Sequence, residues 1–125
     1  MNIPAEHQTI MPYLILQGAE KFIGFTKTVF GATETNTKSF REDGTIMHAE
    51  VTLNGSTIMI TDETTDWAKQ TSNLFVYVQN ADDTYKKALE NGAVSLMELS
   101  DQDYGRTCGV TDLFGNVWWI TSVTK

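Results

Sequence analysis

The sequence predicts an α+β fold made of two tandem βαβββ modules. Three observations support this prediction: a strand–helix pattern that occurs twice, a cap residue at an end of each helix, and three strand signals after each helix. The chain has 125 residues, of which 41% are hydrophobic, enough for one compact domain with its own core. We expect a single domain over residues 1–125, with module one at about 9–63, a connector at 64–72 and module two at about 73–123.

The first half of the chain reads as strand, helix and three strands. Residues 12–17, PYLILQ, are a short apolar run, and apolar side chains then recur at helical spacing up to a glycine at position 31 that suits a helix C-terminus. The pair Asn54-Gly55 predicts a two-residue type I′ hairpin turn. The three expected strands cover residues 33–40, 45–53 and 56–63.

The second half repeats this order. Residues 74–79 read as a strand, Asn80 suits the N-cap of a helix, and Gly92 suits its end. The remaining strands are expected at 94–99, 105–111 and 117–123. Such self-similarity predicts two copies of one structural unit.

Composition and charge exclude several functions. Nine basic and sixteen acidic residues give a formal charge of -7, which repels phosphate backbones, so we expect no nucleic-acid partner. No apolar run approaches the roughly 20 residues of a membrane span. The first ten residues lack the basic start and apolar stretch of a secretion signal. Cys108 is the only cysteine, which rules out an intrachain disulfide. We expect a cytoplasmic protein without a membrane partner.

Three strings give the chain a family resemblance: PYLILQGAEKFIGFTKTVFGA, DGTIMHAEVTLNGSTIMITDE and GRTCGVTDLFGNVWWI. In this order they resemble the vicinal-oxygen-chelate superfamily (glyoxalase, bleomycin-resistance and extradiol-dioxygenase proteins), in its PhnB-like branch. The resemblance covers residues 9–123. It implies that the modules form a curled mixed sheet, a glyoxalase-like half-open barrel around a ligand cavity. It also implies a homodimer, in which modules pair either within one chain or between two chains.

The resemblance also places the metal ligands of the superfamily at four positions. Here these are Met11, Met59, Asn73 and Trp119, and the internal repeat aligns Met11 with Asn73 and Met59 with Trp119. Thioether, amide and indole groups do not replace the carboxylate and imidazole ligands of a divalent cation. We therefore expect no metal and no other cofactor.

His48 and Glu50 are the candidate catalytic residues. If the Asn54-Gly55 turn pairs Leu53 with Ser56, Glu50 lies opposite Met59, and His48 shares its face of the strand. The pair either transfers protons, with His48 as acid or base, or is a buried polar pair that orders the sheet. His7, in the N-terminal arm, is expected to be solvated.

The expected ligand-binding residues combine aromatic and thioether groups with polar tips, a lining that suits a flat apolar or amphipathic molecule. Trp67 is a candidate lid or dimer contact, and Arg106 either meets an anionic ligand group or is a surface charge near Asp101 and Asp103. For each of these residues the alternative is that its side chain only fills the core of the barrel. The set is Met11, Tyr13, Met59, Trp67, Asn73, Phe75, Tyr77, Arg106 and Trp119.

Together these features predict a metal-independent small-molecule-binding protein of the glyoxalase/bleomycin-resistance type. The alternative function is an isomerase- or lyase-type enzyme that uses His48 and Glu50 for proton transfer. A third hypothesis is an unusual metal site that recruits the same two residues.

Overall fold

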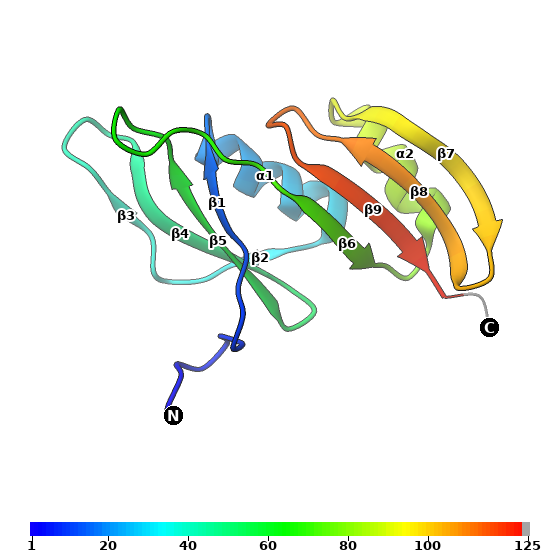
Figure 1. Ribbon diagram of the computed structural model, residues 1–125, viewed down its shortest axis with the longest axis horizontal. Coiled ribbons are helices and arrows are strands. Elements are labelled where there is room, and N and C mark those ends of the chain that lie inside the picture. The colour runs from blue at the N-terminus through cyan, green and yellow to red at the C-terminus, as the bar shows by residue number, and fades with distance from the viewer. Residues whose placement is uncertain (124–125) are drawn as a thin grey trace. The chain divides into compact units, whose positions relative to one another are not determined.

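The computed structural model describes residues 1–123 and divides into two compact units (Figure 1). Unit 1 comprises Met1–Thr71, and unit 2 begins at Ser72. Each unit contains one helix and one mixed sheet, which confirms the predicted α+β class and the order of the elements.

Unit 1 forms a sheet in the order β1-β5-β4-β2, with β3 also paired to β4. Strand β1 is parallel to β5, and the other pairs are antiparallel. The elements are β1 (Tyr13–Leu16), α1 (Ala19–Phe30), β2 (Thr33–Glu34), β3 (Ser39–Phe40), β4 (Ile46–Leu53) and β5 (Ser56–Asp62). The prediction of one strand over 33–40 was wrong, because the Thr35 and Thr37 side chains bond to each other and Lys38 bridges Glu34 and Glu20 between two short strands.

Unit 2 repeats the arrangement with four strands in the order β6-β9-β8-β7. Here β6 is parallel to β9, and the other pairs are antiparallel. The elements are β6 (Asn73–Tyr77), α2 (Ala81–Glu90), β7 (Val94–Gln102), β8 (Gly105–Thr111) and β9 (Val117–Ser122).

The predicted helix caps and the predicted hairpin turn are present. Gly31 caps α1 in the left-handed conformation at φ 71°, and the Asn80 side chain accepts the backbone N–H of Asp83 at the start of α2. Asn54 and Gly55 both have positive φ, 46° and 87°, as a type I′ turn requires. Within residues 1–123, neither helix combines the length and the apolar character needed to cross a membrane.

Each helix covers one face of its own sheet. Helix α1 contacts β2, β4 and β5, where the side chains of Phe22 and Ile23 are buried with Ala49 and Val51. Helix α2 contacts β7, β8 and β9, over Trp118 and other buried residues. Because successive strand residues point to opposite faces, the alternate residues lie on the face that the helix leaves open.

The segment DLFGNVW at residues 112–118, part of the third string quoted above, is a hydrogen-bonding centre around Asp112, which is 5% exposed. One carboxylate oxygen accepts the backbone N–H groups of Phe114 and Asn116 at 2.8 and 2.9 Å. The other accepts the Asn116 amide at 3.1 Å and the Trp118 indole N–H at 2.9 Å. One side chain therefore holds the β8–β9 turn and orients a core tryptophan.

We predict that Asp112→Ala destabilises the protein strongly, since buried donors lose their acceptor. The expected loss is about 3 kcal/mol of unfolding free energy. Urea unfolding followed by circular dichroism measures it. Asp103→Ala removes an exposed carboxylate from the β7–β8 turn and should change stability by less than about 0.5 kcal/mol. Equal losses in the two variants would contradict the assigned role of Asp112.

Candidate functional site

The centre of the site is Glu50, on the open face of β4. Its neighbours Ala49 and Val51 are fully buried on the α1 side, and Glu50 lies opposite Met59 in the register that the sequence predicts. Glu50 itself is only 4% exposed. Unit 1 therefore buries a carboxylate on the face that the helix does not cover.

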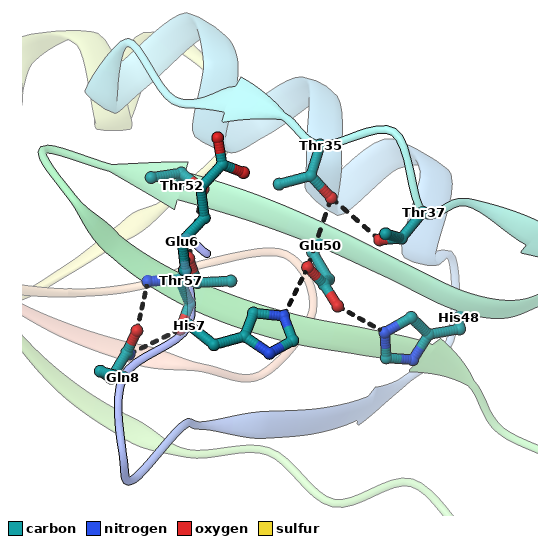
Figure 2. A network of polar contacts seen from close by, with 9 residues as sticks. All are labelled: Glu6, His7, Gln8, Thr35, Thr37, His48, Glu50, Thr52 and Thr57. Atoms are coloured by element: carbon teal, nitrogen blue, oxygen red, sulfur yellow. Dashed lines mark hydrogen bonds and ion pairs between the residues drawn. The ribbon is translucent and has the colours of Figure 1, made fainter. Parts of the chain in front are cut away.

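Two imidazoles meet this carboxylate from different parts of the chain (Figure 2). His48 Nε2 lies 2.8 Å from one oxygen, and His7 Nε2 lies 3.0 Å from the other. The Thr35 hydroxyl makes a longer contact of 3.4 Å. The expectation that His7 is solvated was wrong: its side chain is 18% exposed and forms an ion pair with Glu50 when protonated.

The N-terminal arm is fixed to β5 next to the site. The Gln8 side chain donates to the Thr57 carbonyl at 2.9 Å and accepts the Thr57 N–H at 3.2 Å, as a neighbouring strand would. The Thr57 hydroxyl donates to the Glu6 carbonyl (Figure 2). Glu6 adopts a left-handed φ of 71°. These bonds span about 50 residues and leave no local signal in the sequence, which is why His7 was missed.

Electrostatics keep Glu50 ionised. Burial raises the pKa of the carboxyl, but hydrogen bonds from His48 and His7 lower it and outweigh burial, so its pKa lies below the ordinary value of 4.5. At neutral pH Glu50 is thus a carboxylate that only accepts hydrogen bonds. The Tyr13 ring lies edge-on to His48, at 6.2 Å between centroids, and is more than half exposed.

Unit 2 carries a different surface on its open face. Phe75, Tyr77 and Tyr104 are each more than half exposed. The Phe75 ring lies 5.2 Å from the Tyr77 ring and 6.3 Å from the Tyr104 ring between centroids. Tyr104 was not among the expected ligand-binding residues, because it lies in the β7–β8 turn, where strand alternation gives no direction.

Trp119 completes this surface beside Phe75, its partner in the sheet register. Its indole N–H donates to the Asn73 side-chain oxygen at 3.1 Å. Gly109 lies opposite Trp119, and a Cβ there would approach the indole ring to 2.5 Å. The glycine therefore makes room for the indole.

The remaining candidates lie in varied environments. Met11 and Met59 are half-buried, and Trp67 is 65% exposed in the connector. Arg106 forms ion pairs with Asp82 at 2.6 Å and Asp101 at 3.2 Å, which fits the alternative of a surface charge. Its role in ligand binding stays a prediction.

Cys108 is fully buried beneath α2, and burial raises the pKa of its thiol to about 11. A nucleophilic thiolate is disfavoured there.

The chain belongs to the Glyoxalase/Bleomycin resistance protein/Dioxygenase superfamily, whose family model matches residues 10–120. This confirms the resemblance found in the sequence. An uncharacterized protein of Mycobacterium bovis is 28% identical over 121 residues, which cover 87% of this chain and 79% of that protein.

Two solved structures illustrate the shared fold. A Bacillus cereus protein described as a putative 3-demethylubiquinone-9 3-methyltransferase, PhnB protein, is 23% identical with a TM-score of 0.77, covering 93% of this chain and 100% of that one. An antibiotic binding protein from Streptomyces sp. CB03234 is 16% identical with a TM-score of 0.69, covering 94% and 100%. At these identities the likeness shows the fold alone.

The four residues at the superfamily's metal positions do not fit a divalent cation. Met11 and Met59 offer thioethers, and Trp119 offers an indole N–H that already donates to the Asn73 oxygen. Among residues 1–123, no group of three or more His, Cys, Asp or Glu side chains is arranged to hold a metal ion. Metal independence stays a prediction.

We predict that Glu50 stabilises the fold in a pH-dependent way. Its folded pKa is depressed, so the stabilisation is fully present above the unfolded pKa near 4.5 and is lost as the pH falls through the lower folded pKa. The stability difference between the unsubstituted protein and Glu50→Gln should therefore shrink in acid, as measured by urea unfolding from pH 7 to pH 3. Glu42→Gln, at an exposed carboxylate, is the matched control. A difference that stays constant with pH would contradict the depressed pKa.

Proposed function

We propose that this chain is a small-molecule-binding protein that holds a flat, amphipathic ligand without a metal at the superfamily's usual positions. One observation carries the proposal: each sheet leaves the face opposite its helix open and presents aromatic rings there, Tyr13 in unit 1 and Phe75, Tyr77 and Tyr104 in unit 2. A binding role is also what the name of the Streptomyces neighbour describes for that protein.

The energetics of the unit 2 surface favour an aromatic ligand. Apolar surface removed from water contributes about 25 cal/mol per Å². Ring–ring contacts add roughly 0.5–1.5 kcal/mol each. The Asn73 side chain, already bonded to the Trp119 indole, adds a polar edge to this apolar surface. Such a combination suits a ligand with a flat ring and a few polar substituents.

A second candidate function is an isomerase- or lyase-type enzyme. The observation that favours it is the 2.8 Å contact between His48 and Glu50, because a carboxylate that orients an imidazole is typical of general acid–base sites. In this function His48 gives a proton to the substrate or takes one from it, and Glu50 orients the His48 imidazole.

We predict that the protein binds such a ligand reversibly. A thermal-shift screen of metabolites and aromatic drugs, run with and without divalent metals, identifies ligands. At 100 times Kd a ligand adds about 2.7 kcal/mol of stability. Phe75→Ala should then weaken binding by about 1 kcal/mol, roughly fivefold in Kd. Leu89→Ala, at an exposed residue of helix α2 on the other side of the sheet, is the control.

Mass spectrometry of the recovered ligand separates the candidate functions. A binding protein returns the ligand unchanged. Conversion that His48→Ala abolishes while binding survives supports the enzyme, and conversion that His48→Ala leaves unaltered eliminates His48 as the base. Binding that requires an added metal would contradict metal independence.

We also propose that the protein is a homodimer. Strand β7 is an edge of its sheet and exposes Val94 and Leu96, and unpaired edges of this kind readily associate. We predict a mass twice that of the chain in light scattering at micromolar concentration. A monomer under these conditions would contradict the proposal.

A further inference from the structure

The geometry around Glu50 determines where two protons lie. A carboxylate has no hydrogen to donate, and the pKa of Glu50 is held below its ordinary value. Both imidazoles face it through Nε2, at 2.8 Å for His48 and 3.0 Å for His7. Each Nε2 must therefore carry the hydrogen. In the neutral form of each ring, Nδ1 is then the unprotonated, accepting nitrogen.

We propose that Glu50 locks both histidines in the Nε2–H form, and that His7 joins His48 as a second ligand-binding imidazole whose Nδ1 accepts an O–H or N–H group of the ligand. This inference rests on the proposed binding function and adds to it a residue from the N-terminal arm and a ligand chemistry. The ligand class is a neutral aromatic molecule with hydrogen-bond donors.

His7 meets the requirements for such a role. The Gln8–Thr57 bonds fix the arm, so the ring has a defined position, yet its side chain remains 18% exposed and that of His48 28% exposed. Both side chains are thus held by Glu50 and remain partly exposed. An oriented acceptor costs less entropy on binding than a free one.

The charges around the site favour a neutral donor over an anion. The groups that face Glu50 are His7 from the arm, His48 from β4 and the uncharged Thr35 hydroxyl (Figure 2). The Tyr13 ring of β1 lies against His48. When both imidazoles are neutral, Glu50 gives the cluster a charge of minus one, which repels an anionic ligand. A phenol-type hydroxyl donates to Nδ1 without that repulsion.

Nitrogen NMR of the histidine side chains tests the proton positions directly. The whole chain contains two histidines, so His7→Gln and His48→Gln assign every signal. At a pH where both rings are neutral, we expect both to show the Nε2–H form. Gln8→Ala frees the arm and should return His7 to a mixture of forms while His48 keeps its own. A mixture for His7 in the unsubstituted protein would overturn the proposal.

Glu50→Gln provides a sharper version of this measurement. A glutamine offers one oxygen that accepts and one nitrogen that donates, where glutamate offers two accepting oxygens. One imidazole should keep its Nε2–H form, and the other should move its hydrogen to Nδ1 to accept from the amide. If both rings are unchanged in Glu50→Gln, Glu50 does not set their forms and the proposal fails.

Phenol and anisole, matched probes with and without a hydroxyl donor, test the ligand chemistry. Phenol should shift the Nδ1 signals of both histidines, and anisole should leave them in place. No shift up to the solubility of phenol, or equal shifts with anisole, would overturn the accepting role. Failure of the proposed function gives a different result: the thermal-shift screen finds no ligand, although both rings show the Nε2–H form.

Discussion

The register of the β4–β5 hairpin determines what unit 1 presents on its open face. The Asn54-Gly55 turn pairs Leu53 with Ser56, and each following pair is then set, so that Glu50 meets Met59. A slip of one residue would turn Glu50 towards α1 and its buried apolar side chains. Burying the Glu50 charge without a partner would cost far more free energy than straining the turn. The turn and the position of the carboxylate therefore favour the same register.

Both units have the same arrangement of helix and sheet, but they present different residues on the open face. In both, a helix covers one sheet face and strand alternation assigns the other residues to the open face. Unit 1 places ionisable and hydroxyl groups there around Glu50, whereas unit 2 places Phe75, Tyr77 and Trp119. Gly109 shows how closely the strands follow this rule, because only a residue without Cβ leaves space for the Trp119 indole across the ladder.

Local signals made most of the fold predictable, and long-range contacts explain the errors. The turn at Asn54-Gly55, the Asn80 cap and the pairing of Glu50 with Met59 follow from neighbouring residues or strand period. Two features do not: the break between β2 and β3, which depends on side-chain bonds to a helix residue, and the place of His7 at Glu50, 43 residues away. For the same reason the sequence predicted the Glu50–His48 side of the candidate site and missed its His7 side.

The proposed binding role would explain a feature of the Glu50 cluster that fold stability alone does not require. Well-packed apolar residues usually replace a buried charged pair without loss of stability, so stability alone does not require this carboxylate. One histidine would already provide it with a partner. The chain instead brings a second one on an arm that holds Glu6 in a left-handed conformation, at a cost of about 1 kcal/mol or more. Glu50 thus combines two partly exposed imidazoles and local backbone strain, a combination that is typical of binding and catalytic sites.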